Sequence, residues 1–409
     1  MTKILLISPY FPPEVGSAAH LFYELGQALR GRGHEVLVLT GQPRYHVAKP
    51  RGTSRRQLLV RENYQGLRVW RVFNLEIPWD VPVLRGLDQF ASAFLTLLAG
   101  LSLPPFDVAL VYSPPLPLAL AALGLGRLRR RPVVVNVQDL FPQSAVDLGV
   151  LRQPLLIQIF RSMEFFLYRH ADLITVHSPG NQRYILDAGG KPEKVTVIPN
   201  WIDTEAIRPA CRNNGLRAGL GLKEQFVVSF AGIMGYSQDL ETVLHSAKIL
   251  KDHPDIVFLM VGDGVEKPKL LQFARNNSLD NVFFLPMQPK AKYPEVLAAS
   301  DLCLVTLRQE VQTPVVPSKI LSIMAAGRPV LASLPLDGDA PRLINEAGCG
   351  IVIPPQEPSI MARTILDLCR DSESRAQMGN QARQYAEQHL SVAACTRQIE
   401  GFLLEACNH

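Results

Sequence analysis

The stretch PVVPSKILSIMAAGRPV, residues 314–330, contains a loop, a short helix and the start of a strand. Apolar residues between positions 320 and 324 have helical spacing, Gly327 ends the helix, and an extended run follows. We predict that Ser318 caps the helix and that Lys319 adds a full charge to the positive end of its dipole. The stretch therefore predicts either an anion site suited to a diphosphate or a buried core helix whose Lys319 is solvated.

Length and composition indicate a globular protein of two domains. The chain has 409 residues, which is too long for one ordinary core, and 47% of them are hydrophobic against 19% charged. The six cysteines lie in the second half without a CxxC pair, so we expect reduced thiols and no metal site. The start, Lys3–Ser8, fits a buried strand and not a secretory signal, which predicts a cytoplasmic protein.

Two segments of the first half are candidates for contact with a membrane surface. Arg44–Arg71 is basic and carries no nucleic-acid-binding motif, so we expect no nucleic acid there, and either an anionic membrane or plain solvent. Ile77–Phe106 is apolar, and its residues 89–106 carry no charge. Gly100 and Pro104 interrupt this run, which favours a core helix with an exposed apolar edge over a transmembrane helix. The protein is then expected in the cytoplasm or at the inner face of the cytoplasmic membrane.

Strands and helices alternate along the chain in two series, which predicts an α/β fold with two Rossmann-like, doubly wound domains facing a central cleft. The expected strands are 3–8, 35–40, 107–112, 132–137, 171–177 and 194–198, then 225–231, 256–261, 282–284, 301–306, 330–332 and 351–353. A polar stretch, 208–224, separates the series. We place the domains at 1–205 and 206–384, with a final helix at about 385–409 packing back on the first. Residues 41–66 are expected to form an exposed excursion.

Ligands of such domains bind outside the carboxyl ends of the strands, where four candidate residues converge. They are Gly16, Asp139, Gly232 and Lys319. Gly16 either lets a ligand approach the backbone closely or serves only the turn. Asp139 follows an apolar strand, and its carboxylate either binds a ligand or caps a helix.

Several motifs follow one another in order along the chain. They are YFPPEVG (10–16), RGHEV (32–36), QDLFPQS (138–144), VIPNWID (197–203), AGIMGYSQDL (231–240), VGDG (261–264) and the 317–330 stretch. Together they resemble the GT4 family of GT-B glycosyltransferases, in its WbuB/WcaI-like branch, and the resemblance runs essentially from end to end.

This resemblance implies a retaining sugar transfer from a UDP- or GDP-sugar, held mainly by the second domain, to an acceptor held by the first. It implies front-face attack, in which the acceptor hydroxyl approaches from the leaving-group side and a phosphate oxygen takes its proton. Neither a metal nor another cofactor is expected, so cations and backbone amides must neutralise the diphosphate. The acceptor is expected to be a lipid-linked saccharide of surface polysaccharide assembly.

Two departures from the family pattern concern the diphosphate. Ile233 and Gln238 stand where the family commonly carries an Arg and a Lys directed at the diphosphate. Lys319 should then supply the charge, helped by the backbone amides of Gly16 and Ser318.

Other departures concern the sugar and the ribose. Ser322 stands where the family commonly carries a ribose-binding glutamate, and it can offer only a neutral hydrogen bond. Gln138 stands where many relatives have a His, and it cannot act as a base. Asp139 is therefore the expected sugar- or acceptor-binding group.

The candidate residues fall into three groups, and Lys319 belongs to two of them. The predicted catalytic residues are Asp139, Gly16 and Lys319. The predicted donor-binding residues are Gly232, Gly235, Gln238, Gly262, Asp263, Gly264, Met287, Ser318, Lys319, Ile320 and Ser322. The predicted acceptor-binding residues are Glu14, Gln138 and Ser144, of which Glu14 could instead cap the helix that follows it.

Two other functional classes fit the same architecture. A nucleotide-sugar epimerase would release a changed sugar nucleotide without any acceptor, although the sequence places no residue pair for proton exchange. A non-catalytic nucleotide-sugar-binding protein would explain the missing Arg, Lys and Glu. Loss of donor hydrolysis or transfer in Asp139→Ala, with nucleotide binding kept, would exclude this last class.

Overall fold

The computed structural model describes residues 1–14, 16–43, 57–74, 82–147, 149–311, 314 and 316–408, apart from the side chains of residues 17 and 82–85. The chain forms two compact units: unit 1 comprises Met1–Asn200 and Val392–His409, and unit 2 comprises Trp201–Ser391. The division precedes the expected 205/206 boundary, because the Ile202 N–H donates to the carbonyl oxygen of Leu390 (2.8 Å) within unit 2. The first parts of the two segments expected at a membrane, 44–56 and 77–81, lie outside the described residues.

Unit 1 contains an eight-stranded sheet in the order β3-β4-β2-β1-β5-β6-β7-β8. Its strands are β1 (Lys3–Ser8), β2 (Glu35–Gly41), β3 (Leu59–Tyr64), β4 (Leu67–Val72), β5 (Val108–Ser113), β6 (Val133–Val137), β7 (Leu173–Val176) and β8 (Val195–Val197). All neighbouring strands are parallel except β3 and β4. β1, β2 and β5 to β8 lie where the apolar runs predicted strands.

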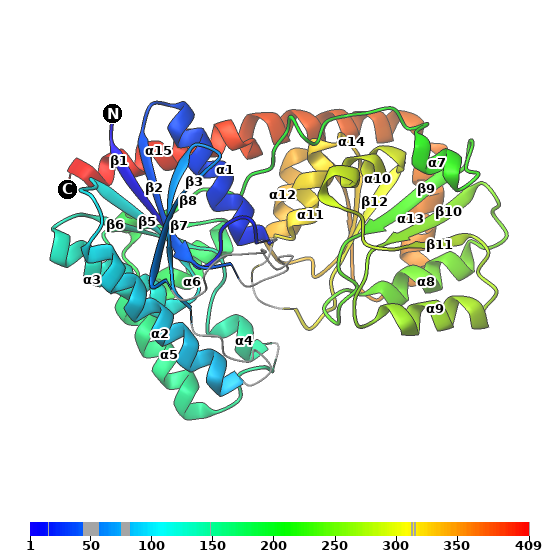
Figure 1. The fold of residues 1–409 in the computed structure, drawn as a ribbon. Coiled ribbons are helices and arrows are strands. Elements are labelled where there is room, and N and C mark those ends of the chain that lie inside the picture. The colour runs from blue at the N-terminus through cyan, green and yellow to red at the C-terminus, as the bar shows by residue number, and fades with distance from the viewer. Residues whose placement is uncertain are drawn as a thin grey trace. The chain divides into compact units, whose positions relative to one another are not determined.

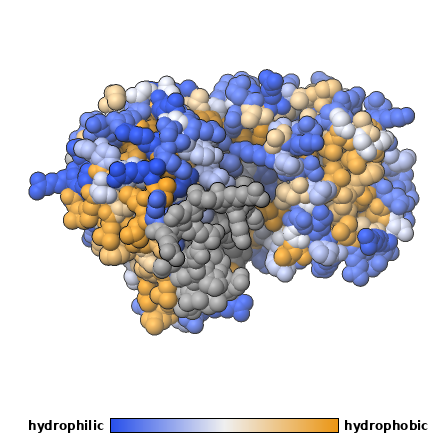
Figure 2. Space-filling model, in the orientation of Figure 1, coloured by the Kyte–Doolittle hydropathy of each residue, from blue (hydrophilic) through white to orange (hydrophobic). Residues whose placement is uncertain are grey.

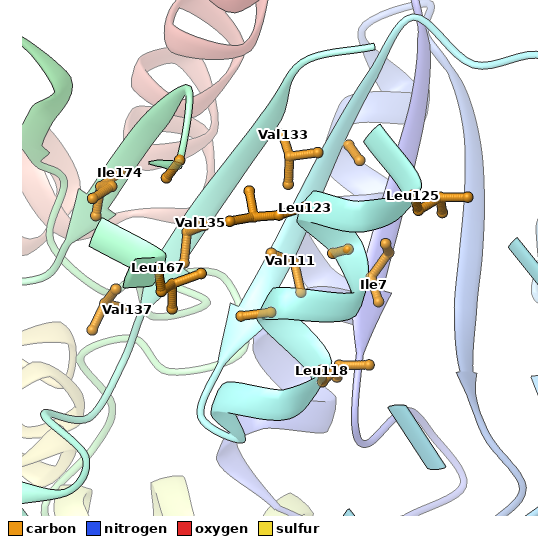
Figure 3. Packing of buried hydrophobic residues seen from close by; sticks show 14 of the residues in the cluster. Ile7, Val111, Leu118, Leu123, Leu125, Val133, Val135, Val137, Leu167 and Ile174 are labelled. Atoms are coloured by element: carbon orange, nitrogen blue, oxygen red, sulfur yellow. The ribbon is translucent and has the colours of Figure 1, made fainter. Parts of the chain in front are cut away.

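Helices cover both faces of this sheet (Figure 1). They are α1 (Ser17–Gly31), α2 (Pro82–Leu101), α3 (Leu116–Arg129), α4 (Gln143–Asp147), α5 (Pro154–His170), α6 (Pro179–Asp187) and α15 (Val392–Asn408), with a 3-10 turn at Pro192–Lys194. α3 packs against both α2 and α5, while α1 packs against α15. Figure 3 shows Leu118 and Leu123 of α3 over Val111 and Val135 of the sheet, where alternate strand residues meet the helix.

Helix α2 is the core helix expected within Ile77–Phe106. It packs against α3, and its Ala93 is buried, whereas Leu87 and Phe94 are exposed along one edge. None of the described helices combines the length and the apolar character that crossing a membrane requires.

The exposed excursion expected at 41–66 is wrong in its described part, since β3 and β4 form an antiparallel hairpin at the edge of the sheet. An edge strand has one neighbour and tolerates charged residues, so β3 lacks the apolar pattern that reveals a central strand. The arginines of this hairpin are engaged: Arg71 is buried and pairs with Glu62 (2.7 Å), and the Arg61 guanidinium lies 4.1 Å from the centroid of the Trp70 ring. The described part of the basic segment is therefore not a free cationic surface.

Unit 2 contains a six-stranded parallel sheet in the order β11-β10-β9-β12-β13-β14. The strands, all at predicted places, are β9 (Phe226–Ala231), β10 (Ile256–Val261), β11 (Val282–Leu285), β12 (Leu302–Thr306), β13 (Val330–Ser333) and β14 (Gly350–Ile353). The helices are α7 (Gly215–Gly219), α8 (Leu240–Ile249), α9 (Lys267–Asn276), α10 (Tyr293–Ala299), α11 (Ser318–Ala325), α12 (Asp339–Ala347), α13 (Pro358–Arg370) and α14 (Ser372–Tyr385). A 3-10 turn lies at Lys290–Lys292 and a π-helical turn at Ala386–Leu390.

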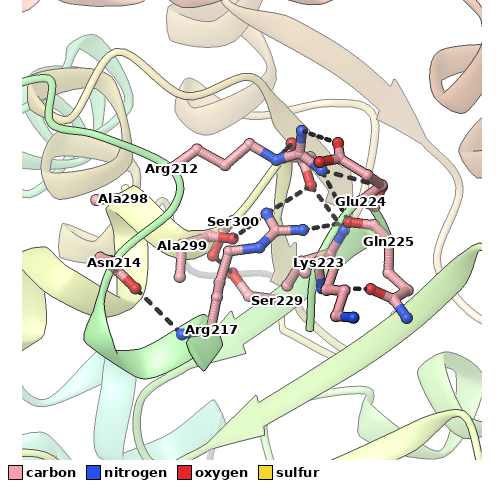
Figure 4. Close-up of polar contacts among 12 residues, drawn as sticks. Arg212, Asn214, Arg217, Lys223, Glu224, Gln225, Ser229, Ala298, Ala299 and Ser300 are labelled. Atoms are coloured by element: carbon pink, nitrogen blue, oxygen red, sulfur yellow. Dashed lines mark hydrogen bonds and ion pairs between the residues drawn. The ribbon is translucent and has the colours of Figure 1, made fainter. Parts of the chain in front are cut away.

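The start of unit 2 is fixed by Arg217 of α7, whose side chain is buried with 1% of the residue exposed. Its guanidinium donates to the carbonyl oxygens of Ala299 (3.0 Å) and Gln225 and pairs with the Asp301 carboxylate at 3.2 Å (Figure 4). Gln225 precedes β9 and Asp301 precedes β12. These contacts of Arg217, which we call the clasp, therefore join α7 to the amino ends of two neighbouring strands. They lie opposite the carboxyl edge, where ligands of such sheets bind.

Replacing Arg217 with methionine should destabilise unit 2 by about 1–3 kcal/mol, because the Ala299 carbonyl oxygen loses its donor, while Asp301 and Gln225 keep only their bonds to Arg212 and Val227. Hydrogen exchange of the β9 and β12 amides, followed by mass spectrometry in denaturant, measures unit 2 separately from unit 1. Arg363→Met removes a guanidinium that is 87% exposed and should change stability by less than about 0.5 kcal/mol. Wild-type exchange in Arg217→Met would contradict the role of the clasp.

Candidate functional site

The carboxyl edge of the unit 2 sheet is built from two loops that bond to each other. The Gly232 N–H donates to the carbonyl oxygen of Val261 (2.9 Å), and the Met234 N–H donates to that of Asp263 (2.8 Å). Gly262 has a φ of +152°, and a Cβ there would lie 1.9 Å from the carbonyl oxygen of Gly232, so only glycine fits. The glycine motifs predicted for the donor therefore form a close-packed backbone surface.

Four further predicted residues complete these loops. A Cβ at Gly264 would lie 2.4 Å from the carbonyl oxygen of Met234, so this glycine is also required by packing. The exposed carboxylate of Asp263 accepts the N–H of Gly264 (2.9 Å), as in a tight turn. The N–H of Gln238 donates to the carbonyl oxygen of Gly235 (3.0 Å), which closes the turn that carries the Gln238 side chain.

Lys319, from the first turn of α11, reaches the same loop. Its Nζ donates to Oε1 of Gln238 (2.7 Å) and lies 4.0 Å from the centroid of the Phe230 ring. A Cβ at Gly232 would lie 3.6 Å from Nζ. Gln238 carries no charge, and desolvation lowers the pKa of Lys319 to about 7. The structure therefore brings the predicted cation together with two predicted donor residues.

The start of α11 corrects the predicted cap. Pro317 is the N-cap and no side chain caps the helix, because Ser318 is already its first helical residue. Ile320 departs from its predicted donor contact, since its side chain is fully buried and its N–H donates to the carbonyl oxygen of Pro317 (2.9 Å). The amides of Ser318 and Lys319 have no acceptor among the described residues. These two amides and the Lys319 ammonium are what this helix end offers an anion.

Ser322, which was predicted to hydrogen-bond the ribose of the donor, is buried inside unit 2. Its hydroxyl is hydrogen-bonded to that of Tyr293, whose pKa burial raises. The sequence did not predict this contact, because nothing in the local pattern around Tyr293 links it to a residue of α11. Met287 follows β11 at the carboxyl edge, and its side chain is exposed.

In unit 1 the candidate residues lie where β1, β5 and β6 are neighbours in the sheet. Asp139 follows β6 and remains exposed to solvent, while desolvation by the surrounding protein raises its pKa. Burial, the charge of Asp139 and, to a smaller extent, Tyr10 raise the pKa of Tyr112 on β5. Tyr112 and Tyr10, which were assigned no role from the sequence, thus lie near the predicted catalytic carboxylate.

Gln138 is buried, and its side chain is engaged within unit 1. Its Nε2 donates to Oδ1 of Asn136 (2.8 Å) and of Asn200 (2.9 Å), and the Asn200 amide donates back to Gln138 Oε1 (2.7 Å). Asn136 in turn donates to the hydroxyl of Thr175 (2.9 Å). Both N–H groups of the Gln138 side chain are therefore used within unit 1, where they position the loop that carries Asp139. They do not point to the predicted role of Gln138 in binding the acceptor substrate. A polar Asn136 inside an apolar strand was the sequence signal of this network.

The remaining predicted residues of unit 1 lie in the loop after β1 and on α4. The buried Glu14 carboxylate accepts the N–H of Phe11 (3.3 Å), and no side chain caps α1, so Glu14 stabilises its own loop. Gly16 has an extended φ of 169° and no atom within 4 Å of a Cβ, so neither conformation nor packing requires a glycine there. Ser144 is half-buried on α4, and its N–H donates to the carbonyl oxygen of Leu140 (2.8 Å).

Metal binding was not expected from the sequence. Within the described ranges, no three His, Cys, Asp or Glu side chains form a group that could hold a metal ion. Metal independence of the reaction stays a prediction.

Comparison with known proteins assigns the family. Residues 16–201 match the model of the glycosyl transferase 4-like domain, and residues 215–385 match that of the glycosyl transferases group 1. The chain belongs to the GT4 family of glycosyltransferases. Its two Rossmann-like units have the GT-B fold, which confirms the fold and the family that the motifs predicted.

Two similar proteins illustrate this membership, and one solved structure illustrates the fold. WbjE, assigned as a glycosyltransferase in Pseudomonas aeruginosa, is 28% identical over 65% of this chain and 68% of its own length. WcaI, assigned to colanic acid biosynthesis in Escherichia coli (strain K12), is 25% identical over 97% of this chain and 98% of its own. The structure of HepE from Anabaena in complex with UDP has a TM-score of 0.73 at 21% identity and covers 98% of this chain and 100% of that one. HepE has also been solved with UDP-glucose.

Proposed function

We propose that this glycosyltransferase transfers a hexosyl or deoxyhexosyl group, with retention of configuration and without a metal, from a UDP- or GDP-sugar to a lipid-linked saccharide in surface polysaccharide synthesis. Two relatives support the proposal. WcaI is assigned to colanic acid biosynthesis, and the fold neighbour HepE binds UDP and UDP-glucose.

The observation that carries the proposal is the setting of Lys319. Lys319 is half-buried, and the partners of its ammonium group are an uncharged amide, Gln238, and an aromatic ring, Phe230. No carboxylate of the described residues pairs with it, so its charge is left uncompensated in this part of the chain, beside the amides of Ser318 and Lys319 at the positive end of the α11 dipole. This arrangement suits the two phosphates of a nucleotide diphosphate.

The glycine loops complete the proposed donor site of unit 2. Gly232, Gly235, Gly262 and Gly264 carry no side chains at their positions of the carboxyl edge, so a diphosphate can approach the backbone closely there. We assign the exposed side chains of Asp263 and Met287 at this edge to the nucleoside. Ile320 and Ser322, both buried, support the helix from inside.

The proposed reaction needs no protein nucleophile. A hydroxyl oxygen of the acceptor forms a bond to the anomeric carbon of the donor sugar, and the bond from that carbon to the phosphate oxygen breaks. The leaving nucleoside diphosphate keeps the bond's electron pair, and one of its oxygens takes the proton of the hydroxyl. Lys319 and the amides of α11 stabilise the negative charge that develops on this leaving group.

In unit 1 we assign Asp139 to a sugar or acceptor hydroxyl. Its exposed carboxylate can accept a hydrogen bond, and the neighbouring Tyr112 and Tyr10 add hydroxyl groups to this edge. Gln138 positions the loop, Ser144 lies on α4 beyond it, and Gly16 leaves open space at the start of α1. An epimerase gains no support, because no paired acid and base emerges among the described residues at this edge.

Lys319→Ala should weaken binding of the cognate UDP- or GDP-sugar by about 1.5–3 kcal/mol, roughly tenfold to over a hundredfold, because it removes a charge-assisted contact. Thermal stabilisation by a panel of UDP- and GDP-sugars identifies the ligand, and titration calorimetry then measures both affinities. Lys248→Ala, which removes an exposed cation from α8 of the same unit, should leave the affinity unchanged. Equal affinity of Lys319→Ala and wild type would refute the assignment.

Asp139→Ala should lower turnover of the donor at least about a hundredfold while leaving nucleotide-sugar affinity within about twofold, because Asp139 acts on the sugar or acceptor. The measurement is release of UDP or GDP, with and without acceptor, beside calorimetry of the same variant. Wild-type turnover in the variant would remove Asp139 from the mechanism. A wild-type chain that binds the sugar nucleotide without turning it over would instead be a non-catalytic binding protein.

A further inference from the structure

Helix α2 carries an exposed apolar stripe that the proposed chemistry does not use. Leu87, Phe90, Phe94, Leu98 and Leu101 recur at helical spacing on one side of the helix, and each is at least 44% exposed. A monomeric soluble protein rarely exposes so many large apolar side chains in a row. We therefore expect another molecule to cover this stripe.

Helix α5 repeats the pattern. Leu155, Ile159 and Phe166 are exposed at a spacing that places them on one side of the helix, with 69%, 43% and 45% of each residue exposed. Both α2 and α5 pack against α3, so the two stripes belong to one helical layer of unit 1. Figure 2 shows hydrophobic side chains gathered over these helices at the lower left of the view. We call the two stripes together the α2–α5 surface.

The charges on the two helices are distributed by sign. Asp88 of α2 and Glu164 of α5 are buried, with 6% and 2% exposed. Glu164 accepts hydrogen bonds from Tyr168 (3.0 Å) and Tyr184 (3.3 Å) inside unit 1, and burial raises its pKa to about 7. The described exposed ionisable side chains of α2 and α5 are Arg161, Arg169 and His170. Arg169 follows Phe166 by three residues and so borders the stripe, whereas Arg161 lies farther round α5. Exposed apolar side chains bordered by arginine, with the carboxylates turned inward, complement an anionic lipid surface.

A groove beside α5 fits the same partner. It has a volume of about 660 Å³ and lies between α4 and α5, where Arg161 is flanked by the apolar side chains of Ile157, Phe165 and Val146. Arg161 donates to Gln143 of α4 (3.3 Å), so its guanidinium is held at the groove. An exposed carboxylate, Asp147, lies on α4 and accepts from Gln143 (2.6 Å), outside the two stripes.

We propose that the α2–α5 surface binds an anionic lipid bilayer, with the apolar stripes entering the interface and Arg161 and Arg169 contacting lipid phosphates. The inference extends the proposed function, since an enzyme bound in this way meets a lipid-linked acceptor without extracting its lipid from the membrane. It rests on helix α2 of the predicted Ile77–Phe106 segment and adds α5; the contact predicted for Arg44–Arg71 stays a prediction.

Flotation of the full chain with vesicles tests the proposal without donor, acceptor or turnover. The chain should float with vesicles of equal parts phosphatidylglycerol and phosphatidylcholine, and at least about tenfold less with pure phosphatidylcholine. Leu87→Gln/Phe90→Gln/Phe94→Gln should lower binding to the anionic vesicles more than about tenfold, since it removes three inserting side chains. Arg161→Gln/Arg169→Gln should lower binding to the anionic vesicles and leave the weak binding to neutral vesicles unchanged.

Matched controls separate this surface from general stickiness. Ile249→Gln/Leu336→Gln/Ile360→Gln removes three exposed apolar side chains from unit 2 and should float like wild type. Circular dichroism and thermal unfolding verify the fold of each variant, and gel filtration without lipid reports its oligomeric state. A chain that floats with neither vesicle type, or a triple variant of α2 that floats like wild type, would overturn the proposal. A lipid-free dimer that dissociates in that variant would assign the surface to a second copy.

The result is independent of the proposed chemistry. A chain that fails to float and still turns over a nucleotide sugar overturns this inference alone. A chain that floats and neither binds nor turns over any nucleotide sugar of the panel overturns the proposed function and leaves the membrane surface standing.

Discussion

The site in unit 2 depends on one contact, the hydrogen bond from Lys319 to the uncharged side chain of Gln238. A carboxylate in place of Gln238 would hold the ammonium charged and satisfied, leaving little for a ligand. The amide instead orients Nζ over Phe230, where desolvation brings its pKa to about 7. An arriving diphosphate can then supply the missing negative charge, and the proposed donor binding rests on that exchange of partners.

The rest of each unit keeps such a contact in place. In unit 2 the glycine loops after β9 and β10 hold each other at the carboxyl edge, and Arg217 fastens the opposite end of the sheet. In unit 1 the amides of Asn136, Gln138 and Asn200 form a comparable network below Asp139. Hydrogen bonds between such polar groups fix a loop in one conformation, which an active site needs. Gln138, which the sequence predicted to bind the acceptor, is one of these supports.

Sequence alone located the strands of both sheets except the β3–β4 hairpin, because central parallel strands are uniformly apolar and an edge strand is not. It also located Lys319 and Gln238, because each lies in a motif of its own and both motifs follow strands at the same edge of the sheet. It could not assign a role to Tyr112, Tyr293 or Asn200, whose partners lie far along the chain and meet them only in the folded protein. Ser318 failed as a cap because the helix starts one residue earlier than its hydroxyl requires.

The most direct measurement of the central claim is proton uptake on binding. A nucleotide sugar has no phosphate proton that titrates near neutral pH, so any uptake reports the protein. At pH values above its pKa of about 7, Lys319 is mostly neutral in the free protein. Because a bound diphosphate favours the charged form of Lys319, affinity for the nucleotide sugar should fall as pH rises through that value. Calorimetry at about pH 7.5, in buffers of different ionisation enthalpy, should show uptake of at least roughly half a proton by wild type and none by Lys319→Met. No uptake by wild type, or equal uptake by both proteins, would contradict the account.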